Sequence, residues 1–436
     1  MAVFSSDVLN PGVRRRELFG WAMYDFANSG YTTVVLTAVF AAYFVGGVAG
    51  GAAWAPLAWT AALSVSHVIV MLTMPSLGAW ADLRAAKKRL LMLTTAACVL
   101  TTLALAWARP GAVLLAMALI VVSNTFYAYG ESLTAAFLPE LAKPDAMGKV
   151  SGWGWGLGYL GGMLTLGLCL AYVLSAQAQG IPASQFVPVT MWITAAMYGL
   201  AALVTFALLR EHAQPSSAGT SEAGSGPRAA LRRLRATFRE ASRYRDFMWL
   251  LLCTVAYQGG VAVAITLAAI YAEQVIGFQP QETMLLIFVL NIAAAVGAFG
   301  CGYLQDAFGH KRVLALTLLG WVLTCVLAAL ATSKGQFWWA AGVAGLCMGS
   351  SQSAGRAMVG LFAPEARLAE FFGLWTFGTR LASIVGPLAY GLITWATGGN
   401  QRVAIASTTV LFVLGLLALA PIRVARGRAA AMAATV

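Results

Sequence analysis

The chain has 436 residues, of which 60% are hydrophobic and 10% charged, whereas a soluble globular domain carries about 25% charged residues. This composition excludes a soluble domain and indicates an integral, multi-pass membrane protein with the lipid bilayer as its partner. The 28 lysines and arginines exceed the 16 acids, but in a membrane protein the placement of these charges relative to the bilayer decides their meaning, so no nucleic-acid partner is expected.

Residues 1–17 are expected to form a cytoplasmic N-terminus. They lack the short apolar core and the small-residue cleavage site of a signal peptide, so the first helix is expected to be retained. The six cysteines lie singly in apolar segments, without the spacing of a metal site or a redox pair. We expect them to be packing residues, and we expect no metal and no cofactor.

Twelve membrane-spanning helices are predicted when roughly 20 apolar residues are taken as one span. Residues 18–210 form the predicted N-terminal half, with helices near 18–45, 57–80, 90–108, 111–136, 151–176 and 188–210. Residues 246–421 form the predicted C-terminal half, with helices near 247–275, 282–304, 313–332, 336–360, 371–397 and 402–421. Residues 422–436 are a predicted cytoplasmic tail.

Residues 211–245, between the halves, are small and polar and then basic. This composition predicts a cytoplasmic linker that is partly a surface helix. Its arginines have two interpretations. They contact anionic headgroups, or they belong to a charged, solvated helix that serves only as a tether, which is the interpretation we favour.

The orientation follows from the positive-inside rule. With the N-terminus inside, the cytoplasmic segments hold all 28 lysines and arginines except those in the opposite loops (Arg109, Lys334, Arg402) and those within helices (Arg356, Arg380). An even number of spans places both termini in the cytoplasm. We therefore expect a bacterial inner (plasma) membrane protein with both ends inside.

The first apolar helix, residues 21–45, carries an acid near its start. Asp25, Asn28, Ser29 and Thr32 fall at i, i+3, i+4 and i+7, so they form one polar stripe on an otherwise apolar helix. An acid inside a spanning helix usually faces a water-filled pathway and marks a functional site. The alternative is that Asp25 snorkels into the cytoplasmic interface.

An internal repeat relates the two halves. GAWADLRAAKKR after helix 2 and GYLQDAFGHKR after helix 8 have the same spacing, and FLPELA and FAPEA follow with nearly the same offset. Two six-helix halves with a substrate site between them are the arrangement of a rocking secondary transporter. The predicted fold is therefore all-α, with two pseudo-symmetric six-helix halves, and a monomer is expected.

The loop pattern G-x-x-x-D-x-x-x-x-[KR]-[KR] resembles the signature of the major facilitator superfamily. More narrowly, WAMYDFANSGYTT, FLPELA, GWGWGLGYLGG and AEFFGLWTFGTRLASIVGPLAYG resemble the vacuole-effluxer branch, in a bacterial-type member, over nearly the whole chain. The resemblance implies transport, and amino-acid efflux is the first expectation, because the best-known members export amino acids from the fungal vacuole. Helix 7 of that branch usually reads Tyr-Asn-Asp-Gly. Here it reads Tyr257, Gln258, Gly259, Gly260, so an acid suited to coupling is missing.

The resemblance also implies that helices 1, 4, 7 and 10 line a central cavity, so polar residues on these helices are the candidates for substrate binding and coupling. They are Tyr24, Asp25, Asn28 and Ser29 on helix 1, Asn124, Tyr127 and Glu131 on helix 4, Tyr257 and Gln258 on helix 7, and Gln352 and Arg356 on helix 10.

Two charge pairings are expected among these helices. Glu131 and Arg356 occupy repeat-related positions, so we expect them to pair as a gate or coupling device. As an equal alternative, each anchors to a neighbouring loop, with Glu131 reaching the basic residues between helices 2 and 3. Arg380 on helix 11 is expected to meet Asp25 in a structural ion pair or, less favoured, to contact an anionic group of the substrate.

The loop acids Asp82 and Asp306 are expected to cap the N-terminus of a neighbouring helix, where the helix dipole favours negative charge, and so to latch a closed state. The basic loop residues beside them are gating or structural candidates: Lys87, Lys88, Arg89, Lys311 and Arg312. On helix 5, Gly154, Gly158 and Gly162 recur every fourth residue, a pattern that lets helices approach closely.

The leading functional hypothesis is a secondary active transporter of a small solute, most plausibly amino acids, that works by alternating access and is coupled to protons through Asp25 or Glu131. The chain has no G-x-x-x-x-G-K-[ST] loop for ATP, and three histidines without an H-E-x-x-H pattern do not indicate an enzyme. The alternatives are a lysolipid or glycolipid flippase of the same fold, or a membrane sensor or scaffold without transport activity.

Overall fold

The computed structural model describes residues 5–213 and 227–433, and all the long elements in these ranges are helices. The N-terminal half begins with a bent spanning segment, Arg15–Val48, that contains α1 (Arg15–Tyr31), α2 (Phe40–Tyr43) and two π-helical turns, η2 (Thr32–Ala38) and η3 (Phe44–Val48). It continues with α3 (Ala55–Arg84), α4 (Lys87–Ala104), α5 (Val113–Ala135), the short α6 (Leu138–Leu141), α7 (Met147–Ala178) and α8 (Ala183–Leu208).

The C-terminal half is preceded by α9 (Pro227–Ala241), which is the helix within the described part of the predicted linker; residues 214–226 lie outside the described residues. The half itself comprises α10 (Arg245–Tyr271), α11 (Pro280–Phe308), α12 (His310–Leu330), α13 (Lys334–Phe362), η6 (Glu365–Arg367), α14 (Leu368–Ala396) and α15 (Gln401–Leu419). A further helix, α16 (Val424–Ala433), follows.

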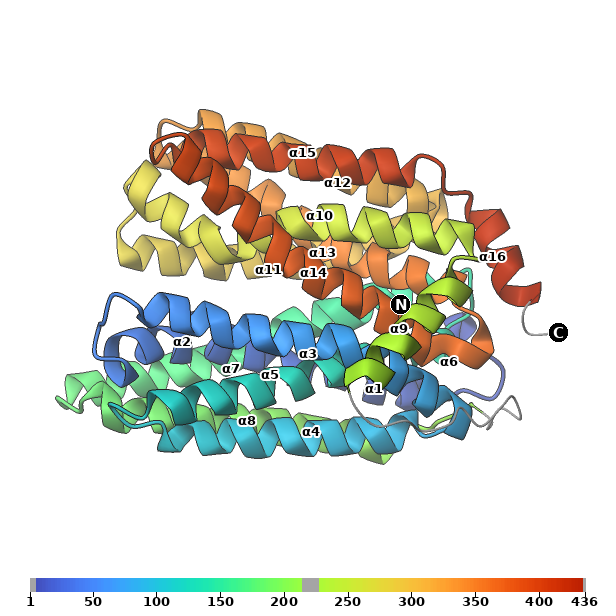
Figure 1. Ribbon diagram of the computed structural model, residues 1–436, viewed down its shortest axis with the longest axis horizontal. Coiled ribbons are helices and arrows are strands. Elements are labelled where there is room, and N and C mark those ends of the chain that lie inside the picture. Colours follow the sequence, from blue (N-terminus) through green and yellow to red (C-terminus); the bar gives the residue numbers. More distant parts are fainter. Residues whose placement is uncertain (1–4, 214–226, 434–436) are drawn as a thin grey trace.

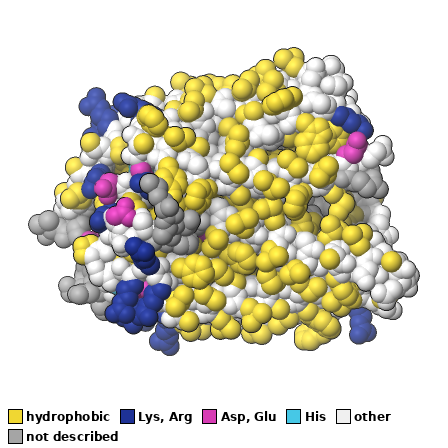
Figure 2. All heavy atoms as spheres, turned by 180° about the vertical axis from the view of Figure 1, so that it is seen from behind, with side chains coloured by type: hydrophobic (Ala, Val, Ile, Leu, Met, Phe, Trp, Pro, Cys, Tyr) yellow, Lys and Arg dark blue, Asp and Glu magenta, His cyan; other side chains and the backbone are white. Residues whose placement is uncertain are grey.

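The all-α membrane fold predicted from the sequence is confirmed. Among the described residues, ten helices are long and apolar enough to span a membrane. Two further helices, α13 and α14, have 29 residues each but contain serines, a glutamine and charged residues among their apolar residues. Together these helices cover the twelve predicted spans. Figure 2 shows apolar side chains across the middle of the molecule, where a bilayer would cover them.

The two halves lie side by side, with α1 to α8 in one and α10 to α15 in the other (Figure 1). They meet mainly through two helix pairs, α3 with α14 and α7 with α11, and α13 also contacts α7 while α14 contacts α5. These pairs are related by the sequence repeat, since α3 and α7 are helices 2 and 5 of the first half, and α11 and α14 are helices 2 and 5 of the second.

Most lysines and arginines gather at one end of the molecule, which we call the basic end; it carries Arg14–Arg16, Lys87–Arg89 and Arg423–Arg428 (Figure 2). The halves are in close contact there. A Cβ on Gly373 would lie only 2.8 Å from the Cα of Pro75, and one on Gly152 would lie 2.5 Å from the carbonyl oxygen of Ala298. Only glycine fits at such approaches. The hydrogen bonds and ion pairs described between the halves all lie in the part of the helices nearest the basic end.

Candidate transport site

A buried ion pair joins the two halves. Arg356 of α13 donates from Nη1 to Oδ2 of Asp25 on α1 over 2.7 Å, and the two side chains are only 4% and 11% exposed. Arg356 also donates from Nη2 to the carbonyl oxygen of Ser151 (2.8 Å) and from Nε to its Oγ (3.1 Å), both on α7. A guanidinium with these three partners ties α13 of one half to α1 and α7 of the other.

Aromatic rings complete the surroundings of Arg356. Its guanidinium carbon lies 4.8 Å from the ring centroid of Trp21 and 5.3 Å from that of Trp155. Such cation–π contacts stabilise a guanidinium that is withdrawn from water. Trp21 is fixed in turn, because its Nε1 donates to the carbonyl oxygen of Thr134 over 2.8 Å.

The glycines of α7 make room for this pair. A Cβ on Gly154 would collide with the Asp25 carboxylate and lie 2.6 Å from Nη2 of Arg356. Gly158 and Gly162 further along the same face lie against α1, near Ser29. The predicted close helix approach through these glycines is therefore confirmed.

A second ion pair joins the halves in a more open setting. Arg380 of α14 donates from Nη2 to Oε2 of Glu131 on α5 over 2.5 Å, with side chains 14% and 31% exposed. The Nε of Arg380 is buried and has no hydrogen-bond partner among the described residues. This pair thus leaves one strong donor unused.

The predicted pairing of Glu131 with Arg356 is wrong, as is that of Arg380 with Asp25, and Glu131 does not reach the loop after α3 either. The reason is geometric. Arg356 turns into α7, where Ser151 accepts its hydrogen bonds and Gly154 leaves space, so Asp25 becomes its nearest acid. Arg380 lies on α14, which packs against α5, and it therefore pairs with Glu131 of α5. The sequence repeat identified equivalent positions but not partners.

Other candidates lie beside these pairs. Gln258 of α10 donates to Gln352 of α13 over 2.7 Å. Asn28 is buried, and Ser29 donates to the carbonyl oxygen of Asp25 over 2.8 Å. Tyr127 stacks on Tyr31 with ring centroids 5.0 Å apart.

Three more candidates also make their contacts within their own half. The hydroxyl of Tyr24 lies 2.8 Å from that of Thr95 and 3.2 Å from that of Tyr198. Asn124 donates to Ser66 over 3.0 Å, and Tyr257 is fully buried against Gly355. Tyr24 differs from Asp25 because adjacent residues of a helix point about 100° apart, so neighbours in sequence face different helices.

The loop acids behave as expected. Asp82 accepts from the amides of Ala369 (3.0 Å) and Glu370 (2.9 Å) at the start of α14. Asp306 accepts from the amides of Gly148 (2.9 Å) and Lys149 (3.0 Å) at the start of α7. Each carboxylate thereby caps a helix of the opposite half, where the helix dipole favours it.

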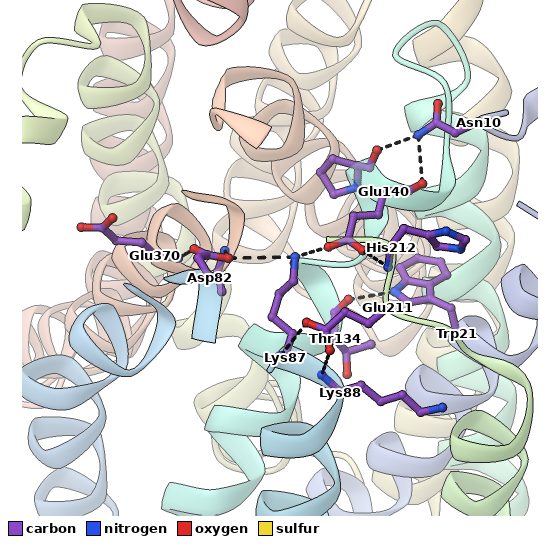
Figure 3. Close-up of polar contacts among 12 residues, drawn as sticks. Asn10, Trp21, Asp82, Lys87, Lys88, Thr134, Glu140, Glu211, His212 and Glu370 are labelled. Atoms are coloured by element: carbon purple, nitrogen blue, oxygen red, sulfur yellow. Dashed lines mark hydrogen bonds and ion pairs between the residues drawn. The ribbon is translucent and has the colours of Figure 1, made fainter. Parts of the chain in front are cut away.

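The basic residues after α3 join a wider polar network at the basic end (Figure 3). Lys87 is buried; its Nζ lies 3.9 Å from Asp82 Oδ1 and is bonded to Glu140. Glu211 caps α4, accepting from the amides of Lys87 (2.7 Å) and Lys88 (3.1 Å). Through Lys87, the network therefore connects the cap that Asp82 forms on α14 to Glu211, which follows α8.

The remaining basic candidates are Lys88, Arg89, Lys311 and Arg312, and their contacts differ from those of the residues at the equivalent positions of the repeat. Lys88 donates to the carbonyl oxygen of Leu209 over 2.6 Å, and Lys311 to those of Ala420 (2.7 Å) and Ile422 (2.8 Å). Arg89 and Arg312 are exposed. Sequence reasoning missed the roles of Ser151, Glu140 and Glu211, although Glu140 belongs to the repeated FLPELA motif.

Within the described part of the chain, no cluster of three or more histidines, cysteines or acids is arranged to hold a metal ion. The site is thus made of two ion pairs and two helix caps that join the halves, together with a glutamine pair within the C-terminal half.

Comparison with solved structures supports this architecture. The human organic anion transporter MFSD10 (TETRAN) superposes with a TM-score of 0.71 at 16% identity, covering 93% of this chain and 99% of that one. The proton:xylose symporter XylE gives a TM-score of 0.70 at 14% identity, covering 92% and 94%. At such identities the likeness shows the fold alone.

Sequence relatives give the class of protein. The MFS-type transporter YxiO of Bacillus subtilis (strain 168) is 29% identical over 407 residues, which is 92% of this chain and 93% of that protein. Autophagy-related protein 22-1 of Aspergillus niger is 25% identical over 304 residues, 64% of this chain and 48% of that protein, so the alignment spans about half of this fungal relative. Fold and relatives together define a membrane transporter of the major facilitator type rather than an enzyme.

The family follows from a match over most of the chain. The family model described as "Vacuole effluxer Atg22 like" matches residues 58–432. The chain belongs to this family, as the resemblance in helix 1, the loops and helix 11 predicts.

Proposed function

We propose that the protein is a proton-coupled secondary transporter of amino acids that works by alternating access, with the basic end on the cytoplasmic side of a bacterial plasma membrane. The buried pair of Asp25 and Arg356, which joins the halves at the base of the site, is the observation that carries this proposal. The positive-inside rule supports the orientation. In this assignment the structure is closed toward the cytoplasm.

The second ion pair supports an amino acid as substrate. An amino acid carries one carboxylate and one ammonium group, and the partly exposed Glu131–Arg380 pair offers one group of each opposite charge. The Nε of Arg380, which has no hydrogen-bond partner among the described residues, would donate to the substrate carboxylate while Nη2 keeps its bond to Glu131. Glu131 would hold the ammonium group. The kinship with vacuole effluxers supports the same class of solute.

Proton coupling follows from what protonation does to the first pair. A proton on Asp25 removes the negative charge opposite Arg356, whose remaining partners, both on Ser151, are neutral. The α1–α13 link between the halves then loses its charge attraction in a site of low dielectric, where that attraction is strongest. Proton binding thus weakens the contact that keeps the cytoplasmic side closed, and proton release restores it.

The test is uptake by the purified protein in liposomes of a labelled amino-acid mixture under an imposed pH gradient of either direction. We expect gradient-driven uptake by the wild type and its loss in Asp25→Asn and in Glu131→Gln. Glu273→Gln is the control, since Glu273 is an exposed acid on the turn after α10, away from the site. If no amino acid moves under either gradient, the substrate assignment is wrong. The same assay with fluorescent lysolipids then tests the flippase alternative.

A further inference from the structure

The linker helix α9 is docked across both halves of the protein. It packs against α3 of the N-terminal half and against α10 and α14 of the C-terminal half (Figure 1). Its inward side is apolar: Leu234 and Ala241 are buried, and the ring of Phe238 lies 5.2 Å from that of Phe377 on α14. A helix that served only as a solvated tether would not bury one face in this way.

The outward side of α9 is basic. Arg232, Arg235 and Arg239 are exposed, and their spacing places them on one face of the helix, away from the face that buries Leu234 and Ala241. In the described part of the chain, their side chains make neither a hydrogen bond nor an ion pair. The next arginines, Arg243 and Arg245, line a cavity of about 150 Å³ at the start of α10. This face therefore presents unneutralised positive charge.

The position of α9 coincides with the level of lipid headgroups. Trp80, near the basic end of α3, is 39% exposed, and the guanidinium of Arg84 lies 4.9 Å from its ring. Exposed tryptophan and arginine near the end of a spanning helix mark the membrane–water interface. Since α9 packs against α3, it lies along the same interface.

Polar contacts connect α9 to the closing caps. Glu240 of α9 pairs with Arg367 over 2.7 Å, and Arg367 pairs with Glu370 over 2.6 Å. The amide of Glu370 is one of the two that Asp82 caps. Burial lowers the pKa of Arg367, but its hydrogen bond to Glu370 and the charges of Glu370 and Glu240 outweigh this, so the pKa lies above its ordinary value and the residue stays charged.

We propose that the outward face of α9, formed by Arg232, Arg235 and Arg239, binds the phosphate groups of anionic phospholipid headgroups. Headgroup binding holds α9 across the two halves and favours the state that is closed at the basic end. The lipid composition of the membrane then sets the conformational balance of the protein. Lipid binding stands independently of the transported solute; only its effect on transport rests on the proposed function.

The first experiment measures lipid binding by native mass spectrometry with phosphatidylglycerol and phosphatidylcholine of the same chain length. Wild type is expected to retain phosphatidylglycerol preferentially. The triple variant R232Q/R235Q/R239Q should bind it roughly 100-fold more weakly, because each arginine near an anionic surface contributes about 1 kcal/mol. The matched variant R232K/R235K/R239K keeps the charge and should keep most of the affinity.

Two results would overturn the lipid assignment. One is equal binding of both lipids, or equal binding by wild type and the glutamine variant. The other is complete displacement of phosphatidylglycerol by inorganic phosphate, which would assign the face to a soluble anion. A charged lipid bound through both headgroup and interface should resist that competition.

The second experiment measures the conformational effect without any substrate. A cysteine at Ser353, which is buried where α13 meets α7, reports opening of the basic end through its rate of thiol labelling, in a background with Cys301→Ala. Labelling in nanodiscs should be slower with phosphatidylglycerol than with phosphatidylcholine alone. Phe238→Ala loosens α9 but keeps its arginines, so it should bind the lipid yet label at a rate that is independent of it. Equal wild-type rates in both lipids would refute the conformational effect.

Discussion

Asp25 and Arg356 lie 331 positions apart in the chain, yet their side chains meet over 2.7 Å between the two halves and are almost completely withdrawn from solvent. No other acid is bonded to Arg356 among the described residues. The consequences of breaking this pair therefore report directly on how the halves are held together.

Replacing Arg356 alone should destabilise the protein. Arg356→Met leaves Asp25 as an uncompensated buried charge, and removing one member of a buried pair costs about 3 to 5 kcal/mol. The double variant with Asp25→Asn removes both charges and should recover most of that loss. Unfolding in detergent, followed by intrinsic tryptophan fluorescence, measures both. A double variant no more stable than Arg356→Met would show that the aromatic contacts of Arg356, not the pair, dominate.

Gly154→Ala should disturb the same pair from the side of α7. The added Cβ would lie 2.6 Å from Nη2 of Arg356 and 2.8 Å from the ring of Trp21. Overpacking of this kind costs about 1 to 3 kcal/mol. Gly167→Ala on the same helix is the control. Its Cβ meets nothing within 4 Å, so the variant should be neutral or slightly stabilised. Equal melting temperatures for the two variants would contradict this packing.

Removing the helix caps should open the basic end. Asp82→Ala and Asp306→Ala each leave two backbone amides at the start of a helix without an acceptor, a loss of about 1 kcal/mol. The caps belong to different contacts, so their effects should add. Faster thiol labelling of a cysteine at Ser353 measures the opening. Labelling at the wild-type rate in the double variant would exclude the caps as a latch.

Lys87→Met should be far more harmful than Arg89→Met, although both residues lie in the first turn of α4. Lys87 is fully buried between Asp82 and Glu140, and its loss leaves both acids without a cation. Arg89 is exposed, and an exposed charge contributes little. Expression level and melting temperature separate the two. Similar behaviour of both variants would mean that Lys87 is not the organising cation of the network.

Much of the fold was predictable because hydrophobic length and the positive-inside rule act locally. Each apolar stretch had to form a helix in the bilayer, where every backbone group needs a partner within the chain. The repeat around Asp82 and Asp306 then indicated two related halves. The capping role of these acids was predictable too, because a carboxylate at a helix junction has few other partners.

The ion pairs were not predictable in the same way. Whether Arg356 meets Glu131 or Asp25 depends on which helix face leaves room, and that is decided by Gly154 and Ser151 on a third helix. The surroundings of Tyr24 were not predictable either, because its neighbour Asp25 faces the other half while Tyr24 faces its own. Partners of this kind follow from helix rotation and packing, which hydropathy does not encode.

The most direct test of the central claim follows proton movement when an amino acid is added to liposomes that hold a pH-sensitive dye and no gradient. If Asp25 carries the coupled proton, the wild type should move protons with the substrate. Asp25→Asn should still exchange labelled for unlabelled amino acid, but without a pH change. Substrate-driven proton movement by Asp25→Asn at the wild-type rate would contradict the account.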